Sequence, residues 1–252
     1  MVRVALLQLE LRKDVEKLRE SVTKLLRNAA AAEADIVCLP EQWYPKKIEN
    51  FEREFKEIID VAKEHHTTII AGAFLEVIKN NTYISCPVID INGIIQGRQF
   101  KIHPFGDERS KVKGGSKVEI FTAGKYKFGV AICHDVVFPE VSRAIALKGA
   151  DLIFCPSRIR EDGIEPWHLY VQVRALENRV PVAAPNACSK QYGGKSLIVD
   201  LEYDEKTNIA VPNQALASVN EQILVMDIDL ERARKMRKLR FDDIKTDIYK
   251  SL

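Results

Sequence analysis

The segment GVAICHDVVFPE, residues 129–140, places a cysteine, a histidine and an aspartate side by side directly after a short apolar run. A cysteine becomes a nucleophile once its thiol has lost its proton, and histidine and aspartate can both move protons. The residue types allow three interpretations. They are a metal site, a triad of adjacent residues, or a single nucleophile, Cys133, served by groups from other parts of the chain.

Adjacent residues on an extended segment point to opposite sides, which disfavours both a metal site and a triad made of Cys133, His134 and Asp135. The sequence also has no second cluster that would supply the remaining metal ligands. Cys133 is therefore the predicted nucleophile. We expect His134 to contribute mainly its backbone N–H, and Asp135 to hydrogen-bond local backbone in the turn before Pro139.

Three further predicted strands end in a polar or ionisable residue. Glu41 follows DIVCLP, Lys101 follows IIQGRQF, and Asn186 ends VPVAAPN. Strand ends at the carboxyl edge of α/β folds present reactive groups, and an unpaired charge beside the core is costly, so several such endings indicate a site. Glu41 would act there as the base, and Lys101 would oppose negative charge developing on a carbonyl or nitrile. Spacing alone leaves open that these charges only form salt bridges between loops.

Hydrophobic periodicity predicts the elements that position these residues. Short apolar runs, typical of buried strands, alternate with helical patterns. Strands are predicted at 2–9, 35–39, 67–74, 127–133, 150–156, 180–186, 196–200 and 223–229, and helices at 15–29, 51–66, 139–149 and 167–179. The Asn92-Gly93 pair predicts a hairpin between 81–91 and 94–100. This order indicates a mixed α/β fold with two sheets between helix layers.

Length, composition and charge exclude several classes of protein. The chain has 252 residues, 46% of them hydrophobic and 29% charged, with a formal net charge of +2. This globular profile lacks the basic field that recruits nucleic acid, and no apolar run has the length of a membrane span. The N-terminus becomes charged too early for a signal peptide, so we expect a cytoplasmic protein. Five scattered cysteines without a CxxC pair disfavour disulfides and structural zinc.

No linker rich in proline, glycine or serine divides the chain, so we expect a single domain over residues 1–252. Residues 231–252 have a polar, charge-rich composition. Such a segment forms either a solvated helix and tail or an arm that packs on a second subunit.

The segments LPEQ, FKIHPF and ICHDVVFPE, in this order, resemble the three catalytic motifs of the nitrilase superfamily, the carbon-nitrogen hydrolases. WHLYVQVRALENRVPVAAPN, GGKSLIVD and ILVMDIDLERARKMR resemble further family segments, so the resemblance covers nearly the whole chain. It implies a four-layer αββα sandwich with two mixed β-sheets and a thioester intermediate, without metal or cofactor. On the matching motifs it implies Glu41 as general base, Lys101 as transition-state stabiliser and Cys133 as nucleophile.

Other residues are candidates for supporting roles. Glu108, in FGDERS, resembles the additional glutamate with which many family members position substrate and lysine. Arg158, in a loop expected to border the pocket, would suit a substrate carboxylate, although a solvated loop arginine is the alternative. His103 faces the same side as Lys101 and would either orient it or serve a structural role. Pro104 stands where the family usually has leucine, so the loop around Glu108 is expected to differ.

Aromatic residues near these motifs have two interpretations each. Trp43, close behind Glu41, would either wall the pocket or pack in the core. Trp167 matches a family segment together with Arg174 and Asn178, but their helical spacing favours a scaffold role. After SLIVD, the segment LEYDEKTN replaces the family's usual Pro-x-Gly turn, so that hairpin is also expected to differ.

The Cys-His-Asp triplet resembles the amidase branches of the family more than true nitrilases. We therefore expect hydrolysis of a small carboxamide to ammonia and a carboxylic acid, with the oxyanion held by Lys101 and the N–H of His134. Nitrile or N-carbamoyl substrates, acyl transfer from the same thioester, and a catalytically silent scaffold are the alternatives. The resemblance also implies a homodimer or higher homo-oligomer, with the C-terminal helix and arm at 231–252 at the subunit interface.

Overall fold

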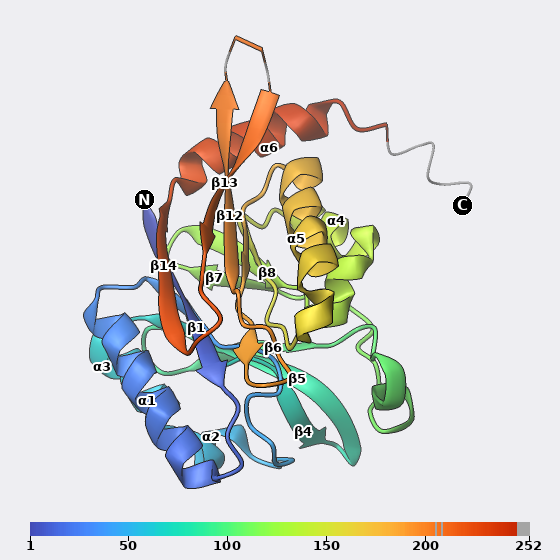
Figure 1. The fold of residues 1–252 in the computed structure, drawn as a ribbon. Helices are drawn as coiled ribbons and strands as arrows, with labels where there is room; N and C mark the ends of the chain where they lie inside the picture. The colour runs from blue at the N-terminus through green and yellow to red at the C-terminus, as the bar shows by residue number, and fades with distance from the viewer. Residues whose placement is uncertain (205, 208, 246–252) are drawn as a thin grey trace.

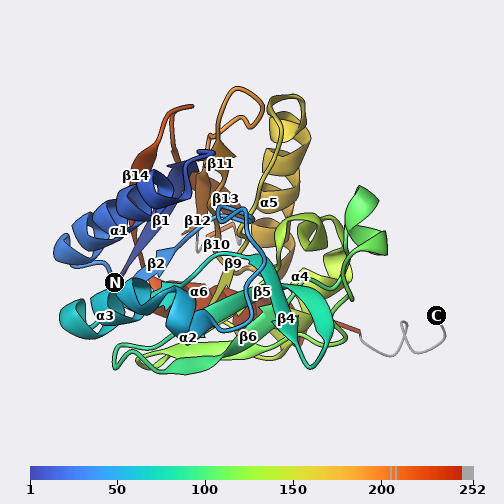
Figure 2. The same ribbon diagram turned by 90° about the horizontal axis from the view of Figure 1, so that it is seen from below.

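The computed structural model describes residues 1–204, 206, 207 and 209–245. Two mixed β-sheets pack face to face, and helices cover the outer face of each sheet (Figures 1 and 2). The predicted α/β class with two mixed sheets in an αββα sandwich is confirmed. Within the described residues, no helix combines the length and the apolar character that crossing a bilayer requires.

The first sheet carries the N-terminal part of the chain. Its strands are β1 (Val2–Glu10), β2 (Ile36–Cys38), β3 (Thr68–Ile70), β4 (Phe74–Ile78), β5 (Asn81–Ile89), β6 (Ile95–Phe100), β11 (Ala187–Cys188) and β14 (Gln222–Ile228). β1, β2 and β3 run parallel, with Val4 opposite Ile36 and Ile36 opposite Thr68. They are buried on both faces, which is why they appear as continuous apolar runs in the sequence. The covering helices are α1 (Val15–Ala31), α2 (Phe51–Glu54) and α3 (Lys56–His65).

The second sheet has the order β13-β12-β10-β9-β8-β7. Its strands are β7 (Ile120–Ala123), β8 (Tyr126–Val130), β9 (Leu152–Phe154), β10 (Val182–Ala184), β12 (Leu197–Asp204) and β13 (Ile209–Leu216). The helices packed on it are α4 (Pro139–Leu147), α5 (Ile164–Asn178) and α6 (Leu230–Asp242), and short 3-10 turns lie at η1 (Gly106–Ser110), η2 (Cys133–Val137) and η3 (Glu161–Gly163). Between the sheets, Leu6 and Ile36 of the first pack with Phe128, Val130 and Phe154 of the second.

Two predicted elements are interrupted in the structure. The helix predicted at 51–66 is broken at Phe55, whose ψ of 45° is not helical. The break lets the Phe55 ring pack in the core against Trp43, with ring centroids 5.2 Å apart. The strand predicted at 67–74 stops at Ile70, and a turn through Gly72 separates it from β4. Gly72 has a φ of +73°, and a Cβ there would lie 2.2 Å from the Pro40 carbonyl oxygen.

Candidate active site

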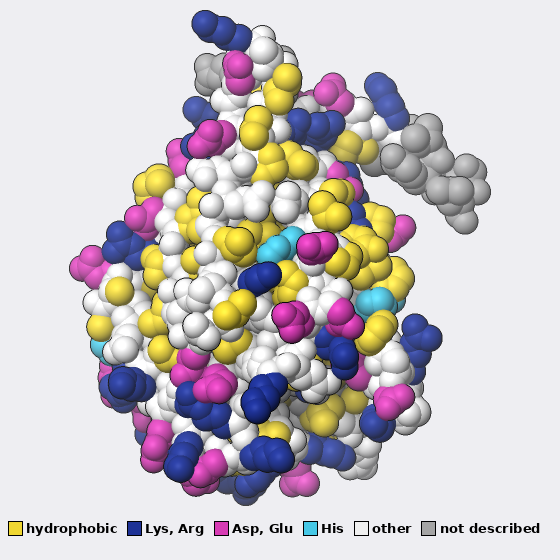
Figure 3. Space-filling model, viewed as in Figure 1, with side chains coloured by type: hydrophobic (Ala, Val, Ile, Leu, Met, Phe, Trp, Pro, Cys, Tyr) yellow, Lys and Arg dark blue, Asp and Glu magenta, His cyan; other side chains and the backbone are white. Residues whose placement is uncertain are grey.

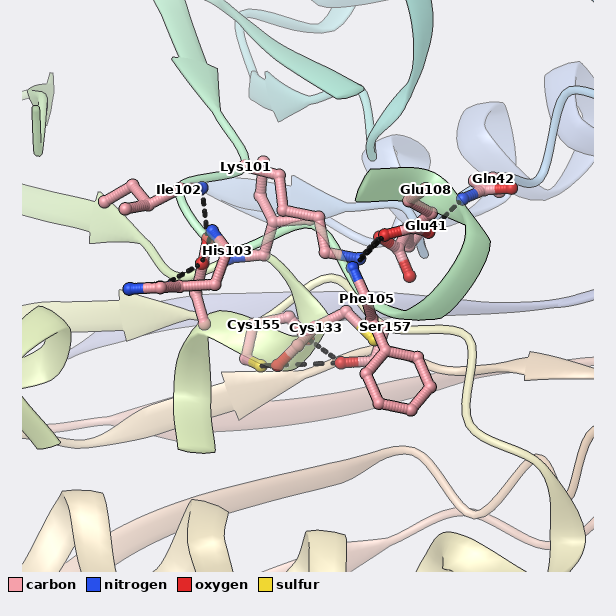
Figure 4. A network of polar contacts seen from close by, with 12 residues as sticks. Glu41, Gln42, Lys101, Ile102, His103, Phe105, Glu108, Cys133, Cys155 and Ser157 are labelled. Atoms are coloured by element: carbon pink, nitrogen blue, oxygen red, sulfur yellow. Dashed lines mark hydrogen bonds and ion pairs between the residues drawn. The ribbon is translucent and has the colours of Figure 1, made fainter. Parts of the chain in front are cut away.

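The structure brings Glu41, Lys101 and Cys133 together from strands of both sheets (Figure 4). Glu41 lies three residues after β2, Lys101 directly follows β6, and Cys133 begins the η2 turn after β8. All three are buried, and Cys133 keeps 9% of its surface exposed. The predicted convergence of strand ends therefore gives one enclosed cluster with access to the thiol.

Lys101 lies between two carboxylates. Its Nζ is 2.7 Å from Glu41 Oε1 and 2.8 Å from Glu108 Oε2. Burial by itself lowers the pKa of Lys101, but the charges of Glu41, Cys133 and Glu108 overcome this effect and hold the pKa well above its ordinary value. A buried ammonium is stable only when it is paired, and the two carboxylates provide that pairing. Lys101 is therefore a fixed positive charge beside the thiol.

Cys133 occupies a strained backbone conformation. Its φ of +48° lies in the left-handed region, which a residue with a Cβ enters only when its surroundings hold it there. The Cys133 N–H donates to the Pro156 carbonyl 2.9 Å away, and the Cys155 thiol lies 3.9 Å from the Cys133 carbonyl oxygen. These contacts, made with the segment that follows β9, hold the sharp turn between β8 and η2 and aim the thiol into the cluster.

Burial, followed by the charge of Glu41, raises the pKa of the Cys133 thiol well above its usual value. Lys101 and the backbone N–H of Arg158 act in the opposite direction, but they do not cancel the effect. The raised pKa keeps the resting thiol protonated, with the Glu41 carboxylate close enough to influence it. Attack on a substrate requires a base, and Glu41 is in the position to be that base.

Hydrogen bonds of the Glu41 backbone and of the Gln42 side chain fix the position of this segment. Its N–H donates to the Ser157 carbonyl at 3.2 Å, which ties the end of β2 to the loop after β9. The next residue, Gln42, donates its side-chain amide to Glu108 Oε1 at 2.8 Å. The sequence interpretation did not single out Gln42, although it is the last residue of the LPEQ motif.

Glu108 lies on the η1 turn that follows Pro104. Its Oε2 accepts from Lys101 and from the Phe105 N–H at 2.8 Å, while Oε1 accepts from Gln42. Three donors on one carboxylate fix its orientation. The structure therefore places Glu108 against the lysine, in the position that the motif resemblance implied, despite the proline in this loop.

A cavity of about 570 Å³ leads to Cys133. Most of its wall is apolar or aromatic, and the residues that line it include Phe105, His134, Val137, Ile159, Trp167 and Tyr170. Trp167 therefore has more than the scaffold role expected from its helical spacing. Burial, and next the charge of Lys101, lowers the pKa of His134, so its imidazole is neutral near neutral pH. His134 is the second residue of η2, and the first N–H groups of a helical turn have no acceptor within the turn.

Arg158 also lines this cavity. Its guanidinium carbon lies 5.2 Å from the centroid of the Tyr192 ring, a cation–π distance. Among the ion pairs of the described residues, none involves Arg158, whereas Arg160 pairs with Asp162 at 3.3 Å. A partly buried guanidinium without a protein carboxylate is free to bind a carboxylate of the substrate.

Other candidates lie outside the cluster. Trp43 packs in the core of the first sheet and donates its Nε1 to the Ala71 carbonyl at 2.8 Å, so it does not line the cavity. Asn186 is buried and joins two loops, because its side chain accepts from the Ile159 N–H and donates to the Gly194 carbonyl, both at 2.7 Å. Within the part of the chain that is described, no group of three acidic, histidine or cysteine side chains is arranged to hold a metal ion.

Known proteins are similar to this chain in sequence and in fold. A protein described as a probable nitrilase of Schizosaccharomyces pombe is 34% identical over 207 residues, covering 79% of this chain and 74% of that protein. The omega-amidase NIT2 of Xenopus tropicalis is 27% identical, with 85% and 84% covered. Among solved structures, a carbon-nitrogen hydrolase from Helicobacter pylori superimposes with a TM-score of 0.85, covering 99% of this chain and 97% of that chain at 23% identity.

The sequence model of the carbon-nitrogen hydrolase family matches residues 3–238 of this chain. This range includes both sheets and every residue of the cluster around Cys133. The chain is thus a member of the carbon-nitrogen hydrolase family, within the nitrilase superfamily, and it is an enzyme of the amidase and nitrilase type.

Proposed function

We propose that this enzyme hydrolyses the C–N bond of a small carboxamide through a thioester on Cys133. The observation that carries the proposal is the buried Glu41–Lys101 ion pair beside the Cys133 thiol, which lines the cavity. A base, a fixed cation and a nucleophile within one enclosed site are the groups that acyl transfer needs.

The first half of the reaction forms the thioester. Glu41 takes the thiol proton while Cys133 Sγ attacks the carbonyl carbon of the amide. The carbonyl oxygen becomes an oxyanion, held by Lys101 and by the N–H of His134. Glu41 then gives its proton to the nitrogen, the C–N bond breaks, and ammonia leaves the acyl group on Cys133.

The second half uses the same groups in the opposite order. Glu41 removes a proton from a water molecule, and the resulting hydroxide attacks the thioester carbonyl. The C–S bond breaks, Cys133 recovers its proton, and a carboxylic acid leaves the cavity. Glu108, which contacts Lys101 but lies farther along the cluster, is proposed to orient the lysine and the amide rather than to transfer the thiol proton.

For the substrate, we propose a carboxamide that carries a carboxylate at its other end. Arg158 supports this choice because it faces the cavity without a protein carboxylate as partner. The similarity to an omega-amidase supports it as well. The apolar wall between Arg158 and Cys133 would pack on a short methylene chain.

The test is ammonia release from a panel of short amides, nitriles and N-carbamoyl amines. Wild-type enzyme should release ammonia fastest from amides, and Cys133→Ala should release none above background. Cys188→Ala, which removes a cysteine of β11 outside the cluster, should keep wild-type activity. Equal ammonia release by the wild type and Cys133→Ala would refute the mechanism. If neither protein released ammonia from any substrate, a catalytically silent scaffold would be favoured.

The similarity to a probable nitrilase keeps a nitrile substrate as the second candidate. Acyl transfer to an amine is the other alternative, because any acyl donor would form the same thioester. Mixing the trapped acyl-enzyme with water alone and with added amines separates the two reactions. A product that contains the amine in excess over free acid would favour transfer.

We also propose that residues 1–252 work as one carbon-nitrogen hydrolase domain in a homodimer or higher homo-oligomer. α5 supports the oligomer because it exposes apolar side chains, with Leu169 62% exposed. The predicted interface arm at 231–252 is described only to residue 245, and its helix α6 packs on its own subunit through Ala233 and Met236. All five cysteines are free thiols, which supports the proposed cytoplasmic location.

A further inference from the structure

A single buried carboxylate joins the two segments that carry the lysine and the nucleophile. Asp135 is fully buried. Its Oδ2 accepts from the Ile102 N–H at 3.1 Å and from the Ile132 N–H at 3.3 Å, and its Oδ1 accepts from the His103 N–H at 2.8 Å. The sequence predicted hydrogen bonds only to the local turn, but two of these three donors lie on the other segment.

Two of the three donors are direct neighbours of the proposed catalytic residues. Ile102 directly follows Lys101, and Ile132 directly precedes Cys133. One side chain is therefore bound one residue away from the cation and one residue away from the nucleophile. The two residues come from different sheets, so no strand pairing connects them directly.

The side chain of His103 extends this contact. Its Nδ1 lies 3.0 Å from Asp135 Oδ1, and its ring stacks on Phe138 with centroids 3.7 Å apart and an interplanar angle of 16°. Phe138 ends the η2 turn that begins with Cys133. Figure 4 shows His103 on the side of Lys101 that faces away from Glu41 and Glu108. His103 thus contacts the cysteine segment, and neither Lys101 nor Glu108 is among its hydrogen-bond partners in the described residues.

We propose that Asp135, together with the His103 ring, is a positioning residue that holds Lys101 in register with Cys133. The proposal rests on the roles proposed above for these two residues. In this role Asp135 does not touch the substrate. It fixes the distance between the Lys101 ammonium and the Cys133 thiol by binding the backbone of both segments. An ionised carboxylate suits this task because both of its oxygens only accept hydrogen bonds, and all three backbone partners are donors.

The Asp135→Asn substitution keeps the shape of the side chain and removes this complementarity. The amide must turn its NH₂ group toward at least one backbone N–H, so donor faces donor and one segment has to move. A displacement of about 1 Å in a catalytic group lowers the rate by about 10²-fold. Asp135→Asn should therefore lower kcat by about 10²-fold while KM changes by less than about threefold, since the cavity wall is retained.

Asp151→Asn is the matched control. Asp151 is also a buried carboxylate, and it accepts from a backbone N–H, that of Lys127, at 2.9 Å, but neither Glu41, Lys101 nor Cys133 is among its partners. Both variants should lose stability, and only Asp135→Asn should lose kcat per folded molecule. Equal kcat per folded molecule in the two variants would overturn the proposal.

A second readout does not depend on the substrate. Lys101 lowers the pKa of the Cys133 thiol, so a displaced lysine leaves less thiolate and slower alkylation by iodoacetamide. Mass spectrometry of the Cys133 peptide should show slower labelling in Asp135→Asn than in the wild type and in Asp151→Asn. If the wild type hydrolyses no amide, the proposed function fails, but this difference in labelling still tests whether Asp135 positions Lys101 beside Cys133. Equal labelling rates in Asp135→Asn and the wild type would overturn that positioning role.

If Asp135→Asn does not fold, His103→Phe tests the same positioning role. Phenylalanine keeps the stacking on Phe138 and removes only the contact between Nδ1 and Asp135. The kcat and the Cys133 labelling rate should both fall, with KM unchanged. Wild-type values for both would overturn the proposal, because the ring contact is part of it.

Discussion

At the scale of single residues, the proposed mechanism depends on a carboxylate that accepts the thiol proton. Glu41→Gln keeps the size of the side chain but removes the proposed base, so position 41 can no longer take the proton from the Cys133 thiol or give it to the leaving nitrogen. We expect kcat/KM for the best amide to fall by about 10²–10⁴-fold. Glu20→Gln, an exposed change on α1, should leave kcat/KM unchanged. A Glu41→Gln enzyme with more than a tenth of wild-type activity would contradict the assignment of the base.

The raised pKa of Cys133 also predicts the pH dependence of its labelling. Burial and Glu41 raise this pKa, so the thiolate forms only at a pH above the usual titration range of cysteine. The rate of Cys133 alkylation should therefore rise with pH and reach its midpoint above about 8.5, the value of a free thiol. A plateau already reached near neutral pH would show instead that Lys101 dominates and that the resting enzyme holds a thiolate.

Arg158 sets the expected substrate selectivity. Arg158→Gln removes the guanidinium but keeps a polar side chain at the cavity wall. KM for an amide with a terminal carboxylate should rise about 10-fold or more, because a charge-assisted hydrogen bond is lost. KM for an uncharged amide of the same length should change little. Equal effects on both substrates would mean that Arg158 contributes to the cavity wall without recognising charge.

The sequence predicted that Glu41, Lys101 and Cys133 meet, as they do in the structure, but it did not predict the contacts that hold them. Glu41 and Cys133 could be found because each follows an apolar strand and belongs to a motif, whereas Lys101 follows the mixed strand β6 and was found mainly through its motif. Gln42 could not be singled out, because its role depends on where the η1 turn brings Glu108. The contact of Asp135 with the lysine segment was equally hidden, since it joins residues 32 and 33 positions apart through a loop without a periodic pattern.

At the scale of elements, most buried strands were predicted, whereas the largely exposed strand β13 was not. β1, β2 and β9 appear as apolar runs because both of their faces are covered. β13 has no such run, since its side chains are mostly exposed, and only its pairing with β12 reveals it as a strand. The helix predicted at 51–66 kept its apolar pattern through Phe55, but the tertiary packing of that ring overrode the helical backbone.

The attachment of α6 gives a prediction at this scale. Arg234 and Arg237 of α6 bind Asp151 at 2.8 and 3.1 Å. Burial alone would raise the pKa of Asp151, but the hydrogen bonds from Arg234 and the Lys127 N–H and the charge of Arg237 lower it overall. A carboxylate with a lowered pKa stabilises the fold above its unfolded-state pKa, and this contribution is lost as the pH falls through the folded-state pKa.

Asp151→Asn should therefore lower the free energy of unfolding by about 1–3 kcal/mol near neutral pH. The difference from the wild type should shrink below about pH 4, where the wild-type carboxyl also becomes protonated. Urea unfolding of both proteins at the two pH values measures this. A difference of constant size would mean that the shape of the side chain, and not its charge, attaches α6.

At the scale of the whole molecule, an apolar face on α5 remains uncovered. Leu169, Tyr170 and Val173 are 62%, 38% and 45% exposed, and hydrophobic side chains gather over α5, right of centre in Figure 3. Tyr170 also lines the cavity that leads to Cys133, so this face adjoins the mouth of the active site. An apolar patch on a helix is typical of a protein interface, and a second copy of the chain is the proposed occupant.

The double substitution Leu169→Lys and Val173→Lys places two like charges on this face, and in a symmetric dimer it places four at the interface. Such a change should dissociate the dimer, since charge in the core of an interface is strongly disfavoured. Light scattering should give twice the chain mass, or a higher multiple, for the wild type and the chain mass for the variant.

Ile94→Lys, which charges an equally exposed apolar residue near the β5–β6 turn, should leave the wild-type mass unchanged. Because Tyr170 connects the face to the cavity, the monomer should also bind amides more weakly. A wild type that is already monomeric would exclude this interface, and an unchanged oligomer in the double variant would place the interface elsewhere.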